Sequence, residues 1–188
     1  MAKKKVSSRK KASIRQIEIV GAVFTVVVGS LLHFAYEWSG NNVIVGLFAA
    51  INESVWEHTK LLATPVLLFA AFEAWRFGFT ARLLKAKLYE LLAGIGFIIG
   101  FYYTYTGAFG IESLAIDIGS FVAAAAIGKH VSFRILSEGG RLKKNMAFVY
   151  GCGIVLICAL FVWATFAPPR IPLFKDPPTG TYGISRSR

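Results

Sequence analysis

The stretch that decides the fold runs from Ile17 to Trp38 and reads IEIVGAVFTVVVGSLLHFAYEW. Its apolar residues form one continuous block, whereas an amphipathic helix of a soluble domain alternates apolar and charged faces. About 20 such residues are enough to cross the hydrocarbon core of a bilayer as a helix. The stretch is therefore predicted to span a membrane.

Four further windows have the same character, and 55% of the 188 residues are hydrophobic while only 16% are charged. This composition is typical of an integral membrane protein. We predict an all-α fold, which is a bundle of five transmembrane helices. The chain divides into three regions. The regions are a basic cytoplasmic N-terminus (1–15), a five-helix transmembrane domain (16–167) and a Pro-rich extracytoplasmic tail (168–188). The four further windows are Leu61 to Phe79, Leu88 to Thr106, Ile116 to Leu136 and Met146 to Phe166.

The basic residues predict the orientation. Sixteen of the 21 Lys and Arg residues fall before the first window or around the second-to-third and fourth-to-fifth connections. Because positive charge is retained in the cytoplasm, this places the N-terminus inside the cell membrane and the C-terminus outside. The net charge of +11 then points to anionic lipids of the bilayer as the partner. No nucleic-acid-binding motif follows the basic N-terminus, so we expect no nucleic acid.

Local patterns refine this outline. The segment between the first two windows has an apolar centre, VIVGLFAA (43–50), that is too short to cross and predicts an interfacial or re-entrant element. Asn52 is the expected N-cap of the next helix. Gly96 and Gly100 form a G-x-x-x-G expected to pack inside the bundle. Cys152 and Cys158 lie about 240° apart on a helix, which disfavours a mutual disulfide.

Polar residues gather at the predicted extracytoplasmic end. His33 and Glu37 are an i, i+4 pair near the end of the first window, and the following stretch NESVWEH (52–58) repeats that spacing. Ionisable groups in a membrane are costly unless they pair, face water or bind a ligand, so a shared pocket is expected. The candidate metal ligands are His33, Glu37, His58 and Asp117, and the candidate catalytic residues are Glu53, Glu57 and Lys60.

Such a pocket supports more than one function. A divalent metal such as zinc could activate water there for hydrolysis of a lipid-like, membrane-accessible substrate, although no H-E-x-x-H motif occurs. The same residues could instead form an ion-paired lock in a non-enzymatic structural or partner-binding membrane protein. A small transporter would also need Glu73 or Glu90, which otherwise are expected to snorkel toward the cytoplasm. Whether the protein is an enzyme stays open at this point.

Several motifs together resemble a known family. They are HFAYEWSGNN (33–42), NESVWEHTK (52–60), FYYTYTG (101–107) and IPLFKDPPTGTYGI (171–184). This combination is similar to a group of small prokaryotic multi-pass membrane proteins described only as a domain of unknown function. The resemblance covers nearly the whole chain except the basic N-terminus. It implies placement in a membrane and implies no activity, substrate or cofactor.

Overall fold

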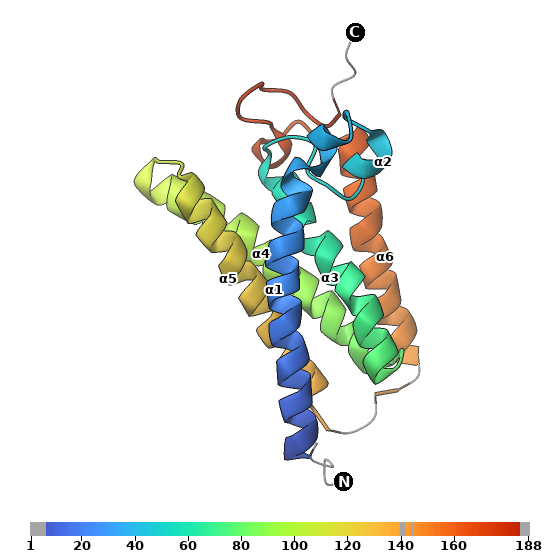
Figure 1. The fold of residues 1–188 in the computed structure, drawn as a ribbon. Helices are drawn as coiled ribbons and strands as arrows, with labels where there is room; N and C mark the ends of the chain where they lie inside the picture. The colour runs from blue at the N-terminus through green and yellow to red at the C-terminus, as the bar shows by residue number, and fades with distance from the viewer. Residues whose placement is uncertain (1–6, 140–141, 144, 185–188) are drawn as a thin grey trace.

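The structure is a computed structural model, and it describes residues 7–139, 142–143 and 145–184. Figure 1 shows a bundle of five long helices that is capped at one end by short elements. Within the described residues, the only β-type pairing is an isolated bridge between Lys175 and Tyr182. In chain order the elements are α1 (Ser8–Trp38), α2 (Val43–Gly46), α3 (Val55–Phe77), α4 (Ala81–Phe109), α5 (Leu114–Leu136), α6 (Asn145–Phe166) and the 3-10 helix η1 (Pro172–Phe174).

Three helices, α1, α5 and α6, are long and apolar enough to cross a membrane. The other two predicted spans fall on α3 and α4, which have 23 and 29 residues and are not among these three. Five crossings therefore stay a prediction. α1 begins well before the predicted window, at Ser8, and its 31 residues make a helix about 46 Å long, which exceeds a hydrocarbon core of about 30 Å.

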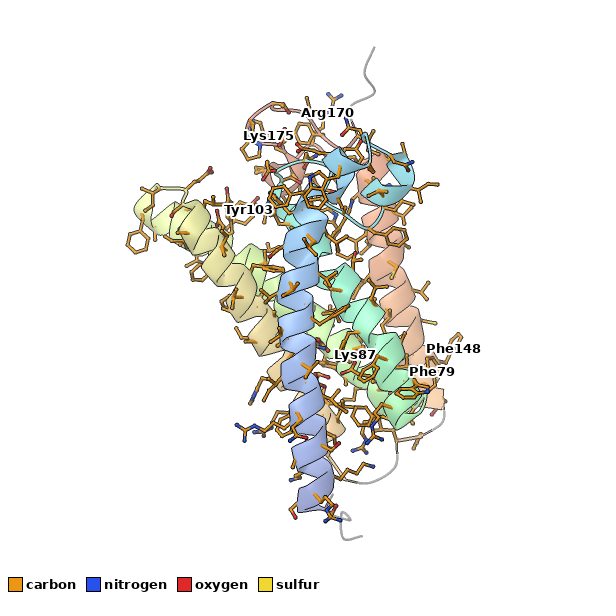
Figure 2. The ribbon with its side chains drawn as sticks, viewed as in Figure 1. Phe79, Lys87, Tyr103, Phe148, Arg170 and Lys175 are labelled. Atoms are coloured by element: carbon orange, nitrogen blue, oxygen red, sulfur yellow. The ribbon has the colours of Figure 1, made fainter. Side chains whose placement is uncertain are left out.

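The distribution of polarity is the reverse of that in a soluble bundle. Large apolar side chains point outward, as Phe79 and Phe148 do at 77% exposure each. Charged side chains such as Lys87 point inward and are buried (Figure 2). A lipid environment favours this arrangement because it solvates apolar surface and forces ionisable groups toward one another.

The helix that starts within NESVWEH begins at Val55, two residues later than an Asn52 N-cap would place it. Ser54, and not Asn52, is the N-cap of α3, since the Ser54 side chain accepts a hydrogen bond from the backbone N–H of Glu57 at 3.3 Å. Asn52 instead accepts from the backbone N–H of Ser54 at 3.0 Å, which forms the turn that precedes the helix. The expectation failed because Asn and Ser are both good N-caps, and only the backbone path selects between them.

Close helix packing depends on glycines other than the predicted pair. Gly96 and Gly100 are exposed, and a Cβ on either would meet nothing within 4 Å, so their expected role inside the bundle is wrong. Gly29 and Gly94 lie at the real contacts. A Cβ on Gly29 would come within 2.5 Å of the backbone oxygen of Leu61. The G-x-x-x-G spacing identified the right helix but the wrong face of it.

The C-terminal segment folds back onto the end of the bundle. Phe174 is buried, and its ring lies 5.1 Å from that of Trp56 in α3. The backbone N–H of Ile184 donates to the carbonyl oxygen of Thr165 at 3.0 Å, which ties this segment to the end of α6. This part of the Pro-rich tail therefore packs on the end of the bundle. Cys152 and Cys158 are free, as their spacing predicts.

The glycine contacts lead to a stability prediction. Gly29→Ala should destabilise the protein by about 1–3 kcal/mol, because its methyl group would collide with the Leu61 carbonyl and the Phe121 ring, both 2.5 Å from the added Cβ. Gly96→Ala, in an exposed helical position, should leave the melting temperature unchanged or slightly higher. Thermal unfolding in detergent, followed by circular dichroism, compares the two. Equal melting temperatures would contradict the α1 to α3 packing.

Candidate metal centre

Two imidazoles and one carboxylate meet at the capped end of the bundle. His33 comes from the last two turns of α1, His58 from the first turn of α3, and Glu53 from the loop just before α3. One ligand atom from each of the three lies within 4.8 Å of the others. The sequence is folded so that α1 and the start of α3 run side by side here, and this juxtaposition creates the site.

The distances suit a metal with little adjustment. Nε2 of His33 lies 3.7 Å from Oε1 of Glu53, and Nε2 of His58 lies 3.4 Å from Oε2 of the same carboxylate. Ligand atoms about 2.0–2.1 Å from a tetrahedral zinc ion are separated by about 3.3 Å. The three side chains are 30%, 52% and 34% exposed in the order His33, Glu53, His58, so a fourth position would be open to solvent.

The His58 ring is oriented by the backbone. Its Nδ1 lies 2.9 Å from the carbonyl oxygen of Ser54, one helical turn earlier. A carbonyl can only accept, so Nδ1 carries the proton and, in the neutral ring, Nε2 keeps a lone pair that faces Glu53. Metal-bound histidines usually have such an outer partner, which fixes the tautomer. The ring centroids of His58 and His33 are 5.4 Å apart.

The C-terminal segment holds the loop that carries Glu53. Oδ1 of Asp176 accepts a hydrogen bond from the backbone N–H of Glu53 at 3.0 Å, and its Oδ2 accepts from the hydroxyl of Thr179. Asp176 is only 5% exposed, and its own backbone N–H donates to Thr181 at 2.9 Å. The D-P-P-T-G turn thus fixes the position of Glu53 although it lies 123 residues away in the chain.

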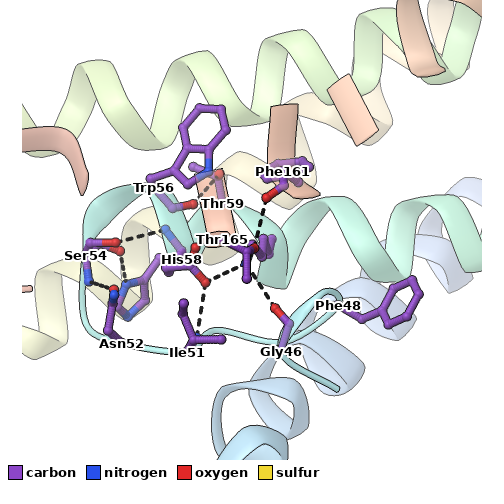
Figure 3. Close-up of polar contacts among 12 residues, drawn as sticks. Gly46, Phe48, Ile51, Asn52, Ser54, Trp56, His58, Thr59, Phe161 and Thr165 are labelled. Carbon is purple, nitrogen blue, oxygen red and sulfur yellow. Dashed lines mark hydrogen bonds and ion pairs between the residues drawn. The ribbon is translucent and has the colours of Figure 1, made fainter. Parts of the chain in front are cut away.

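Glu57 and Lys60 are not part of the histidine cluster and form a buried ion pair beside it. Nζ of Lys60 lies 2.7 Å from Oε2 of Glu57, and it also donates to the carbonyl oxygen of Gly46 at 3.1 Å and to the Thr165 hydroxyl at 2.6 Å. The same Glu57 oxygen accepts from the backbone N–H of Ile51 at 3.1 Å. Figure 3 shows the surroundings, where Gly46, Ile51 and Thr165 converge on this pair.

Burial limits what this pair can do chemically. Glu57 and Lys60 are 2% and 1% exposed, and every polar contact they make joins parts of the protein to one another. The pair connects α3 to the end of α2, to the loop after α2 and to the end of α6. A substrate would reach neither group without opening that network.

Two other candidates lie outside the three-residue cluster. Glu37 is exposed, one turn beyond His33 toward the end of α1. Asp117 accepts a hydrogen bond from the Tyr105 hydroxyl at 2.7 Å, which joins α5 to α4. In Figure 1 the end of α4 and the start of α5, which carries Asp117, splay away from the other helices.

The expectation that Glu73 and Glu90 snorkel toward the cytoplasm is wrong. Both are at most 1% exposed and lie inside the bundle, where Lys87 and Lys129 approach them. Their partners lie on other helices as well as their own, and sequence spacing shows only the Lys87 to Glu90 contact, at i, i+3. The same limitation hid Asp176 and Thr165, whose contacts are long-range.

The fold and the cluster define an all-helical protein with membrane-length helices and a His/Glu group at one end. The chain matches the model of DUF6512, a family of unknown function, over residues 1–184, and it therefore belongs to that family. This confirms the resemblance to a domain of unknown function. No curated protein and no solved structure matches the chain.

The buried ion pair predicts a large effect of removing one partner. Lys60→Met should destabilise the protein by about 3–5 kcal/mol, because Glu57 would stay buried without its counter-charge. Lys85→Met is the matched control. Lys85 pairs at 3.9 Å with Glu138, whose side chain is 55% exposed, and the change should shift stability by less than about 0.5 kcal/mol. Chemical unfolding in detergent measures both. Similar midpoints for the two variants would show that the Glu57 to Lys60 pair does not stabilise the fold.

Proposed function

We propose that this is a multi-pass protein of the cell membrane that binds a divalent metal, zinc by preference, at its extracytoplasmic end. In this proposal the chain crosses the bilayer five times, with the N-terminus in the cytoplasm and the C-terminus outside. The positive-inside bias supports the orientation. Two of the sixteen basic residues on the predicted cytoplasmic side, Lys87 and Lys129, are buried in the bundle, but the bias persists without them.

The observation that carries the metal proposal is the meeting of His33, Glu53 and His58. Two histidines and one glutamate are a ligand set that catalytic zinc sites use, with the fourth position left to water. The two imidazoles beside Glu53 come from separate helices, and a backbone hydrogen bond fixes the ring of His58. This arrangement is more ordered than an isolated surface carboxylate requires. The set is the part of the predicted pocket that the fold brings together.

A metal in this position would supply hydrolytic chemistry, since it lowers the pKa of bound water and polarises a carbonyl or phosphoryl oxygen. We propose a lipid-like substrate. Phe34 and Trp38 are 47% and 70% exposed, and their rings stack 5.7 Å apart beside His33. Aromatic side chains at a membrane interface provide an apolar surface next to water, where an acyl chain could lie with its polar group at the ligands.

The ion-paired lock is the second candidate, and one observation favours it. The separations of 3.4 and 3.7 Å between Glu53 and the two imidazoles also suit ion pairs with protonated rings. In that case the cluster fastens the loop before α3 to α1, in the same way that Glu57 and Lys60 fasten it to α6. A metal is then unnecessary, and the cluster contributes stability only.

Metal content separates the two candidates. Purified wild-type protein should retain about one zinc per chain after dialysis against metal-free buffer, and His33→Ala and His58→Ala should each lose it, because two protein ligands hold zinc poorly. Glu37→Ala is the matched control, since it removes an exposed carboxylate from the same end of α1 and should keep the metal. Elemental analysis gives the stoichiometry.

A second readout addresses hydrolysis. Zinc-loaded protein in vesicles that contain ester, amide and phosphodiester lipids should release a product that His58→Ala does not. If wild-type protein holds no metal and the histidine variants are only less heat-stable, then His33, Glu53 and His58 form an ion-paired lock. If the protein holds metal but forms no product, the proposed metal site stands and the proposed hydrolase activity is wrong.

The orientation has its own test. In a background where Cys152 and Cys158 are replaced by Ser, Lys175→Cys should react with a membrane-impermeant maleimide added to intact cells. Arg15→Cys should react only after lysis, because it lies at the opposite end of the chain's path through the bilayer. Labelling of Arg15→Cys in intact cells would reverse the proposed topology.

A further inference from the structure

A second group of ionisable residues lies inside the bundle, away from the candidate metal centre. It draws on four helices, with Glu18 from α1, Glu73 from α3, Lys87 and Glu90 from α4, and Lys129 from α5. Each of the five is at most 3% exposed. We call these five residues the interior charge cluster. Figure 2 places Lys87 between the helices of the bundle.

Two of the three carboxylates are closely paired. Lys87 contacts both Glu90 and Glu73, the latter with Nζ 2.6 Å from Oε2. Lys129 lies 2.9 Å from Oε1 of Glu90 and 4.0 Å from Oε1 of Glu73. Glu90 therefore lies between two ammonium groups, and Glu73 has one within ordinary ion-pair distance.

Glu18 is the weakly paired member. Its nearest ammonium nitrogen, that of Lys129, is 3.6 Å from Oε2, which is farther than the closest ammonium contact of Glu73 or of Glu90. The other oxygen accepts from the Ser132 hydroxyl at 2.5 Å. Lys129 is shared with a closer carboxylate, so it neutralises Glu18 only in part.

The charges of the cluster do not balance. Three carboxylates face two ammonium groups, which leaves one negative charge in a region that excludes water. Of the other charged side chains on these helices, Arg15, Arg76, His130 and Arg134 are exposed, while Arg82 and Lys85 are partly buried and contact Gly139 and Glu138. A full negative charge that is buried without a counter-ion costs several kcal/mol. One additional positive charge would remove that cost.

We propose that the interior charge cluster binds one exchangeable proton, and that Glu18 holds it. A proton fits better than a metal ion because two ammonium groups already occupy the positions among the carboxylates and would repel a second cation. As a protonated acid, Glu18 keeps the Ser132 contact and leaves Lys129 to Glu90. The bundle thereby contains a protonation site between α1 and α5, independent of any metal at the other end.

Infrared spectroscopy detects a protonated carboxylic acid by its C=O stretch. Full-length protein in detergent should show such a band, and the band should titrate above about pH 4, where carboxylic acids normally ionise. Glu18→Gln, a neutral mimic of the protonated state, should fold and lose the band. Glu37→Gln, on the exposed surface of the same helix, should keep it.

Ser132→Ala provides a check that does not depend on the Glu18 variant folding. It removes the donor that stabilises ionised Glu18, so the midpoint of the band should move to higher pH. The proposal is overturned if wild-type protein has no such band, if Glu18→Gln retains it with the same midpoint, or if Ser132→Ala leaves the midpoint unmoved.

Discussion

The arrangement of the helices depends on the need to neutralise charge inside an apolar bundle. In lipid, apolar faces gain little by meeting one another, because the acyl chains solvate them equally well. Buried ion pairs impose a stricter condition, since each charged group must meet its partner at hydrogen-bond distance. Lys129 contacts carboxylates from α1, α3 and α4, and it thereby fixes the depth of α5 relative to all three.

Small residues make that contact possible. A Cβ on Gly21 would lie 2.7 Å from Nζ of Lys129 and 2.7 Å from the Phe69 ring, so Gly21 leaves room for these two side chains beside α1. At the other end, the Glu57 to Lys60 pair performs the equivalent task for α3, the loop after α2 and α6. Two buried charge networks at different depths therefore specify the register that apolar contacts leave loose.

Sequence reasoning succeeded where the evidence is local. Long apolar windows located α5 and α6 to within a few residues, and the predicted pocket included His33, Glu53 and His58, which the fold brings together, although Glu53 was expected as a catalytic residue and not as a metal ligand. It failed where a partner is distant. Equal depth in the membrane suggested that Asp117 joins the histidines, but depth does not reveal that the α4 and α5 ends splay apart. The apolar window also missed the first turns of α1. These turns carry basic residues, and a hydropathy window detects lipid exposure and not helicity.

The hydrogen bond between the Glu53 backbone and Asp176 has a consequence for biosynthesis. Asp176 is translated 123 residues after Glu53, so this contact cannot form until the later segment emerges from the ribosome. That segment docks through Phe174 and Ile184. A nascent chain that stops at the end of α6 would contain all five long helices and still lack this connection at the capped end of the bundle.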